Sequence, residues 1–293
     1  FSGNVAYTGN IQVDDIVEKT PAHGVEIEGV LVKDSIVKTD DIQEKTSAHG
    51  VEIDGVLLKD GGAAFTSSVS GVSGRLISVT YVACDSTSSA STGNYTKPAG
   101  CTALHIILTG GGGAGGGTSA GQTAGGGGAG ATTIAYVTES SSSYFAGITA
   151  GSGTIAYSVG HGGANSGNTG DSSWFGTDSS NYIAQAGGGY GGNDNGSASG
   201  TASGAVGTGA YAPASSLLLK GGKGTSEFGD GSSGVKTGGK GGASYWGEGG
   251  SGANENGGGG ENAHVYGTGG GGSSGNGNGG SGLGGVLVIY AYT

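Results

Sequence analysis

The hydrophobic and polar positions of this chain follow the two-residue period of β-strands, in short segments separated by small and polar residues. The segments with this pattern are residues 75–82, 102–109, 132–137, 154–159, 215–220 and 286–292. Short runs rich in β-branched and aromatic residues are typical of strands. None of them approaches the roughly 20 consecutive apolar residues that span a bilayer. The pattern therefore predicts an all-β protein, with a polar loop at residues 85–93 and a turn at 94–100.

The N-terminal part contains an internal repeat, with one copy at residues 11–34 and a second at 37–60. Asp15 of the first copy corresponds to Asp41 of the second, so the period is 26 residues. Repeats of this length are typical of stacked, quasi-linear proteins. Two such units bury too little apolar surface to stand alone, so we expect other copies of the chain to supply the missing contacts.

His23 and His49 occupy the same place in the two repeats. Such a pair could form a ring of histidines that binds a metal or senses pH. The alternative is a turn histidine whose ring caps a backbone group, and it is favoured because a repeated position usually serves the repeated fold. We therefore assign no metal ligand to the chain.

Glycine accounts for 74 of the 293 residues and occurs in runs. Collagen is excluded, because it requires glycine at every third position and abundant proline. Disorder is the default for glycine- and serine-rich tracts, but the closing apolar run, residues 286–292, needs a partner strand. The third interpretation is an assembly of extended glycine segments in the left-handed helix of three residues per turn, bonded between segments.

The charge and the cysteine and histidine content of the chain argue against several classes of function. The formal net charge is −11 and no basic patch stands out, so a nucleic acid is not an expected partner. Cys84 and Cys101 are too few for a disulfide-rich scaffold; they are either two small buried hydrophobic residues or a single bridge. The scattered His105, His161 and His264 do not pair with a nucleophile at an informative spacing. We assign no catalytic residue and no cofactor.

Several motifs resemble those of known fibre proteins. The repeats resemble the shaft modules of bacteriophage and large-virus fibres, through Glu44-Lys45-Thr46 and Gly50 to Asp60 and their counterparts in the first copy. The segment Tyr95 to Gly100, the strand that follows it and the ending Gly282 to Tyr290 resemble the glycine-rich C-terminal domain of phage tail fibres. That resemblance covers residues 74 to 293. It departs from the family at Cys101 and in the loop from Asn193 to Leu219.

The resemblance implies a fibrous all-β architecture. We expect a trimeric β-shaft at residues 1–62, a linker at 63–74, and a glycine-rich tip domain at 75–293 built of β-sheets with polyglycine II segments. The number of three chains comes from the resemblance and not from the spacing. Because the chain begins at Phe1 and contains no methionine, we expect that it was processed or that a longer N-terminal part precedes it.

The function implied by the resemblance is that of a virion fibre, exposed to the medium, that attaches the particle to a host surface. The expected partners are two further copies of the chain, a host-surface glycan or outer-membrane protein, and other virion proteins; no membrane insertion is expected. Aromatic residues between glycine blocks are the candidate receptor contacts: Tyr211, Tyr245, Trp246 and Tyr266. The alternative is that they are lids packed over the glycine segments. Trp174 and Phe175 are assigned to the structure.

Two other functions remain open at this stage. One is a capsid decoration fibre or extracellular filament with no specific receptor. The other is a polysaccharide depolymerase, since carboxylate pairs for sugar cleavage are set by distances in space and not along the sequence. The low density of acidic and aromatic residues in the tip domain disfavours the depolymerase.

Overall fold

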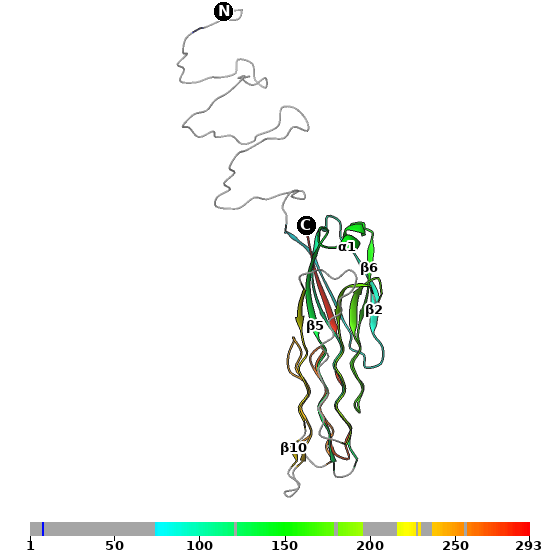
Figure 1. The fold of residues 1–293 in the computed structure, drawn as a ribbon, viewed down its shortest axis with the longest axis vertical. Coiled ribbons are helices and arrows are strands. Elements are labelled where there is room, and N and C mark those ends of the chain that lie inside the picture. The colour runs from blue at the N-terminus through cyan, green and yellow to red at the C-terminus, as the bar shows by residue number, and fades with distance from the viewer. Residues whose placement is uncertain are drawn as a thin grey trace, which may run out of the picture. The chain divides into compact units, whose positions relative to one another are not determined.

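The computed structural model describes residues 74–119, 122–178, 181–195, 216–226, 228–229, 236–254 and 257–293, together with Thr8 (Figure 1). The two repeats, the linker up to residue 73 and the candidate residue Tyr211 lie outside these described residues. The fold is therefore presented for the glycine-rich part of the chain alone.

The described residues are almost entirely β-structure, which confirms the predicted fold class. The elements are β1 Leu76–Ala83, β2 Ser91–Thr96, β3 Ala103–Thr109, β4 Gln122–Thr123, β5 Thr132–Thr138, α1 Ser143–Gly147, β6 Thr154–Val159, β7 Ser173–Gly176, β8 Tyr182–Ala186, β9 Ser216–Leu219, β10 Phe228–Gly229, β11 Lys236–Thr237, β12 Ser274–Gly275 and β13 Val286–Tyr292. Each of the six strands expected from the apolar pattern is present, with ends within one residue of the prediction.

The larger sheet has five antiparallel strands in the order β1-β13-β3-β5-β9. The last strand of the chain, β13, lies between β1 and β3, where Ile289 pairs with Thr80 on one side and Ile106 on the other. This position explains the apolar ending, because a central strand is covered on both edges and its side chains pack on at least one face.

A second antiparallel sheet, in the order β2-β6-β7-β8, packs against the larger one. The side chains that meet between the sheets form one core, which comprises Tyr95, Leu104, Ile106, Leu108, Ala135, Val137, Phe145, Ile155, Val159, Phe175, Ile183, Ala184, Ala186, Leu287, Ile289 and Ala291, together with Cys84 and Cys101. Both cysteines are buried and free, so they act as small hydrophobic residues and are not bridged. Burial raises the pKa of the Cys101 thiol.

Part of the predicted loop and turn is a strand. Residues Ser91–Thr96 form β2, although Tyr95 is their only large apolar side chain. The strand forms because it pairs with β6 along its whole length and buries the Tyr95 ring against Phe175 in the core. Tertiary pairing here outweighs the weak local signal.

Lys97, within the segment that carries the tail-fibre resemblance, is 1% exposed. Its Nζ donates to Glu139 Oε1 at 2.7 Å and to the carbonyl oxygens of Phe145 and Ile148 at 3.2 and 3.1 Å. The same ammonium lies 4.2 Å from the centre of the Phe145 ring. All three donors of the ammonium are thus satisfied, and they fasten the C-terminal end of α1 to the sandwich.

Beyond the two sheets, the chain continues as long extended segments, drawn as wavy traces below the arrows in Figure 1. The central segment, residues 110–118, continues β3. Its N–H groups donate to three neighbours in rotation at N···O distances of 2.8–3.0 Å: Gly110, Gly113 and Gly116 to residues 125–131, Gly111 and Ala114 to residues 168–171, and Gly112, Gly115 and Thr118 to residues 277–283. Its carbonyl groups accept from three further segments, residues 163–167, 189–195 and 270–273.

Every third residue of the central segment therefore returns to the same neighbour. A period of three is the period of the polyproline-type helix considered for these glycine runs, which has no internal hydrogen bonds. Six neighbouring segments surround the central one, and together they satisfy its backbone groups although none of it is β-sheet. We call residues 110–118, 124–131, 160–171, 187–195, 220–226, 238–254 and 257–285 the glycine body.

Close approach of the segments explains why glycine is required. A Cβ atom at Gly112 would overlap the carbonyl oxygen of Thr268, and one at Gly115 would overlap that of Gly271. These obstacles are backbone atoms held in place by the same hydrogen bonds, so they cannot move aside cheaply. The glycine content follows from how tightly the segments pack.

We predict that Gly115→Ala destabilises the protein by about 1–3 kcal/mol, because the added methyl group forces the central segment away from its neighbours. The thermal unfolding midpoint should fall by roughly 2–4 °C for each kcal/mol. Gly147→Ala is the matched control, since a Cβ atom at this last residue of α1 meets nothing within 4 Å. Equal midpoints for the two variants would contradict the packing account.

We predict that Lys97→Met lowers the free energy of unfolding by about 2–4 kcal/mol, because two buried carbonyl groups and Glu139 lose their shared donor. Lys240→Met removes an ion pair with Glu248 in which both side chains are exposed, and should leave the free energy of unfolding nearly unchanged. Chemical denaturation of both variants measures the difference. A Lys97 variant as stable as the Lys240 variant would rule out the fastening role.

Candidate binding surface

Tyr245 and Trp246 lie at the tip of a tight turn that we call the aromatic turn, residues Ser244 to Gly247. The backbone N–H of Ser244 donates to the carbonyl of Gly247 at 2.9 Å, and the N–H of Trp246 donates to the Ser244 hydroxyl at 3.1 Å. The two rings meet edge to face, with centroids 5.0 Å apart. The turn therefore presents two aromatic side chains in a fixed mutual geometry.

The aromatic turn is tied to the larger sheet by the indole of Trp246. Its Nε1–H donates to the Thr109 hydroxyl at 2.9 Å, and that hydroxyl also bonds to the hydroxyl of Thr132 at 2.8 Å. Thr109 is fully buried at the point where β3 becomes the central segment. The ring is thus oriented by the framework and still leaves 37% of the side chain exposed, while Tyr245 leaves 50%.

Tyr266 lies next to the aromatic turn but is more deeply packed. Its carbonyl oxygen accepts from the Ser244 hydroxyl at 2.7 Å, and its ring meets that of Tyr81 edge to face at 6.3 Å. The side chain also packs against a small cluster that includes Val286 and Val288. The hydrogen bond with the Tyr81 hydroxyl, then burial and the charge of Asp85, raise the pKa of Tyr266. Because the ring packs on the cluster, it forms a partial lid on the sheet.

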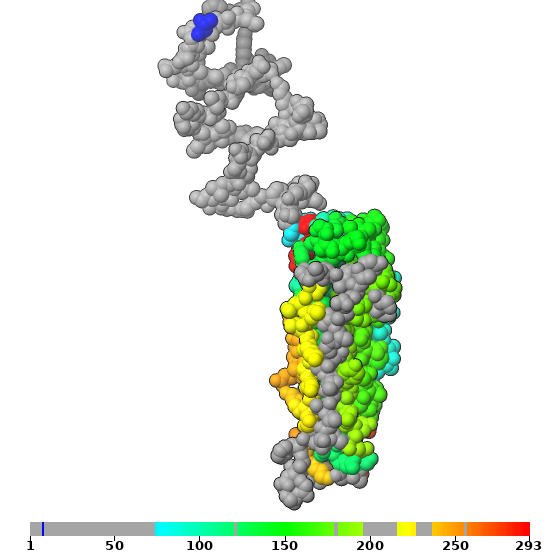
Figure 2. Space-filling view, viewed as in Figure 1, coloured from blue at the N-terminus to red at the C-terminus, as the bar shows by residue number. Residues whose placement is uncertain are grey.

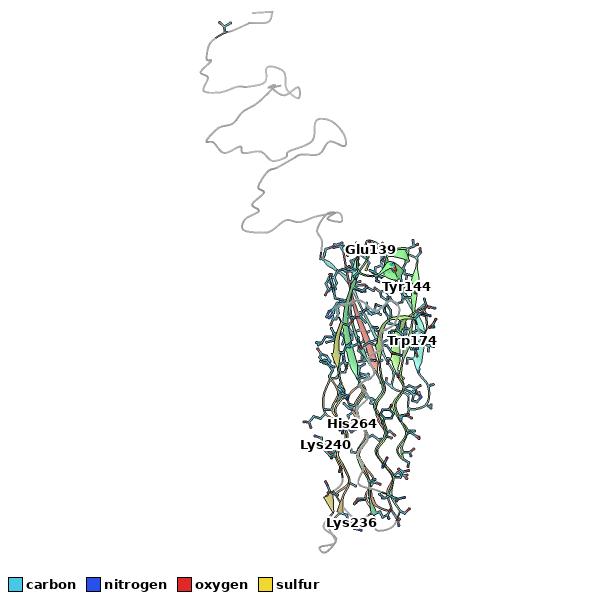
Figure 3. The ribbon with its side chains drawn as sticks, in the orientation of Figure 1. Glu139, Tyr144, Trp174, Lys236, Lys240 and His264 are labelled. Atoms are coloured by element: carbon cyan, nitrogen blue, oxygen red, sulfur yellow. The ribbon has the colours of Figure 1, made fainter. Side chains whose placement is uncertain are left out.

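The structure brings together three of the four candidate contact residues. Tyr245, Trp246 and Tyr266 lie side by side, and Tyr211 is outside the described residues. Of the two aromatic residues assigned to the structure, Phe175 is fully buried in the core. Trp174, labelled in Figure 3, is partly exposed and lies on the other side of β7 from Phe175.

The sequence interpretation missed a larger surface on the side of the five-stranded sheet that faces away from the core. Directly opposed residues of antiparallel strands point to the same side, and the pairs Val79–Tyr290, Tyr81–Val288 and Ile107–Ile134 all do so here. We call the following residues the outer face: Val79, Tyr81, His105, Ile107, Ile134, Tyr136, Leu217, Val288 and Tyr290. His105 stacks on Tyr290 at 5.6 Å.

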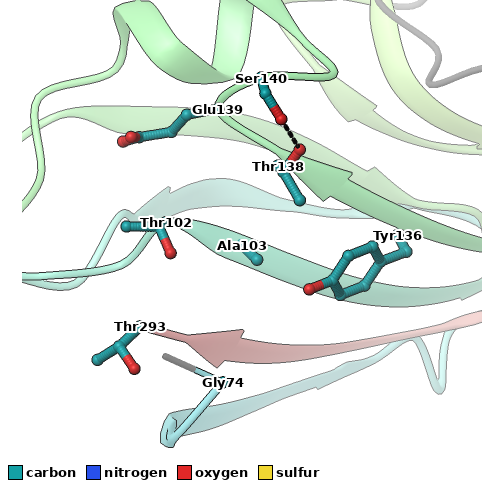
Figure 4. A pocket seen from close by; sticks show the side chains of 8 residues that line it. All are labelled: Gly74, Thr102, Ala103, Tyr136, Thr138, Glu139, Ser140 and Thr293. Carbon is teal, nitrogen blue, oxygen red and sulfur yellow. Dashed lines mark hydrogen bonds between the residues drawn. The ribbon is translucent and has the colours of Figure 1, made fainter. Parts of the chain in front are cut away.

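A groove of about 530 Å³ lies at the margin of the outer face, lined by Gly74, Thr102, Ala103, Tyr136, Thr138, Glu139, Ser140 and Thr293 (Figure 4). The ring of Tyr136 forms one wall, and the hydroxyls of Thr138 and Ser140 bond to each other at 2.8 Å. Glu139 is oriented by the buried Lys97. An aromatic wall beside hydroxyls and a carboxylate suits a small hydroxylated ligand.

Several charged residues on the surface of the glycine body are paired with one another. Glu248 pairs with Lys240, which lowers the pKa of the carboxyl group. A hydrogen bond from the Ser251 N–H, followed by the His264 ring, lowers the pKa of Glu261. In Figure 3 Lys240 and His264 lie below the two sheets, with Lys236 farther along the glycine body.

Within the described ranges, no group of three or more His, Cys, Asp or Glu side chains could hold a metal ion. No helix in that part of the chain is long and apolar enough to cross a membrane.

Comparison with known proteins gives one family. A model described as "Glycine-rich domain" matches residues 86–292, which is more than two thirds of the chain. No curated protein matches the sequence. The matched range begins after β1 and includes the second sheet, the glycine body and all of β13.

We predict that Thr109→Val releases the indole of Trp246, because valine keeps the volume of threonine but cannot accept the hydrogen bond. In a Trp174→Phe background, where Trp246 is the one remaining tryptophan, its fluorescence should shift to longer wavelength and be quenched more strongly by acrylamide. Trp174→Phe alone is the reference. Unchanged emission and quenching would mean that the hydrogen bond does not orient the ring.

Proposed function

We propose that this chain, which belongs to the glycine-rich domain family, is a virion fibre protein whose glycine-rich domain attaches the particle to a host surface. The observation that carries the proposal is the aromatic turn. It holds Tyr245 and Trp246 partly exposed on a framework of backbone hydrogen bonds. The motifs of the shaft and of the tip that resemble viral fibres support the same assignment.

The rings of Tyr245 and Trp246 are already held in place before a partner binds. Trp and Tyr are the residues that most often dominate binding energy, and they do so best when their rings are already fixed before binding. Here the Ser244 hydroxyl, the Thr109 hydroxyl and the glycine body hold both rings, so little side-chain entropy is lost when a partner binds. A rigid body that carries an exposed aromatic pair is suited to recognition.

The proposed partner is a host-surface glycan or an outer-membrane protein, contacted from the extracellular medium. We propose that three copies of the chain act together, joined to other virion proteins through their N-terminal part. Weak sites on several copies then add through effective concentration, which can raise overall affinity by factors of 10²–10⁴ without a new contact. No catalytic role is part of this proposal.

The second candidate function is a decoration fibre or extracellular filament without a specific receptor. The outer face favours it, because an extended apolar surface suits contact between protein subunits as well as contact with a receptor. In that case the aromatic turn would serve packing alone, as a lid on Thr109 and its neighbours.

We predict that Tyr245→Ala with Trp246→Ala weakens attachment of the full-length fibre to host cells by more than about tenfold, as expected for truncation of two anchor residues. Attachment is measured with labelled fibres on whole cells, and folding by circular dichroism. Tyr190→Ala is the matched control, because Tyr190 is an equally exposed tyrosine of the glycine body. Undiminished attachment of a folded double variant would favour the filament.

A further inference from the structure

The outward-facing residues of the two sheets differ in polarity. In β2 the outward residues Thr92, Asn94 and Thr96 are exposed and polar, as expected where an antiparallel sheet faces water. The five strands β1, β3, β5, β9 and β13 contain no Asp, Glu, Lys or Arg at all. Their outward side is formed mainly by aliphatic and aromatic residues, together with His105 and a few threonines such as Thr138.

Much of this outer face is open in the described part of the chain. Val79, Tyr81, Tyr136 and Leu217 each leave half or more of their surface exposed. Tyr266 packs over Val288 and Ile107, which are buried. The open part is the row that crosses the sheet through Val79, Tyr290, His105 and Tyr136. A contiguous apolar surface of this kind on a soluble domain marks a place of contact with another molecule.

We infer that the outer face is the surface through which copies of this chain contact one another. The inference rests on the proposed fibre, and it names the side of the domain that each copy turns toward its neighbour. Its chemistry is that of an interface core, which is depleted of charge and enriched in aromatic residues.

Two observations favour a second copy as the occupant. The five strands that form the outer face carry no Asp, Glu, Lys or Arg, so two copies can meet there without bringing like charges into direct contact. The 73 residues before Gly74 include both 26-residue repeats, which need other copies to bury their apolar side chains. Copies joined there would present β1, the next strand along the chain, at high effective concentration.

The shape and chemistry of the outer face disfavour a small ligand. Small-molecule sites are concave and contain a few convergent polar groups. The outer face is instead one side of a sheet, where Val79, Ile134 and Leu217 offer no hydrogen bond. A surface of this kind is matched by another extended apolar surface.

The test is photo-crosslinking of the full-length chain. Benzoylphenylalanine replaces Tyr81 or Tyr136 on the outer face, and in a matched control it replaces Trp174 on the other sheet. Each change exchanges one aromatic side chain for another, so the fold should be retained, and circular dichroism checks this. After irradiation, the expected product at positions 81 and 136 is a band at twice the chain mass of 27.6 kDa. Its cross-linked peptides should lie in β1, β3, β5 or β13 of a second copy, and position 174 should give the single chain.

Two results would overturn the inference: light scattering that gives the mass of one chain, or an assembled chain that cross-links from position 174 and not from 81 or 136. Cross-links from positions 81 and 136 to a different protein would also overturn it, because the outer face would then bind a foreign partner. The outcome is independent of the attachment assay, since that assay changes Tyr245 and Trp246 and leaves the outer face intact.

Discussion

This structure depends on hydrogen bonds between backbone segments that can come close enough to bond only because they are rich in glycine. The central segment, residues 110–118, is surrounded by six other segments and bonds to them in a period of three residues. Ordering glycine is entropically expensive, so the arrangement is stable only when many segments bond at once. A Cβ atom added at a glycine such as Gly112 or Gly115 would break several contacts together, because the neighbouring backbones are also fixed by their own bonds.

The sandwich sets the register of the glycine body. The strands β3, β5, β8 and β13 run directly into glycine segments or out of them, and Gly110 continues the ladder of β3 and β5 through its bond to Ala131. The apolar core between the sheets therefore fixes where each glycine segment begins. The space-filling view shows the same continuity, with residues 216–226 in yellow running down one side of the unit beside the orange segment (Figure 2). Their hydrogen bonds, such as that from Gly222 to Ala243, join the two.

The sequence was sufficient to predict the apolar strands, since residues such as Ile106 and Ile289 lie in runs of apolar and β-branched residues that are typical of strands. It was insufficient for β2, whose pairing with β6 decides its conformation, and for α1, which is too short to show a helical period. The sequence did hold a signal for the outer face, because β3 and β13 have apolar residues on both of their sides. That signal predicts a strand, but it does not tell which side of the strand faces away from the core. The bond from Trp246 to Thr109 spans 137 residues, so local patterns could not place the aromatic turn.

Amide hydrogen exchange of residues 110–118 tests the central claim most directly. If these N–H groups are bonded to their neighbours as described, they should exchange as slowly as those of β3, because both open only when the whole unit unfolds. Exchange near the rate of an unstructured chain, with β3 still protected, would contradict the account. The glycine body would then be a disordered tract attached to a β-sandwich, and the aromatic turn would lose the rigid support on which its proposed role depends.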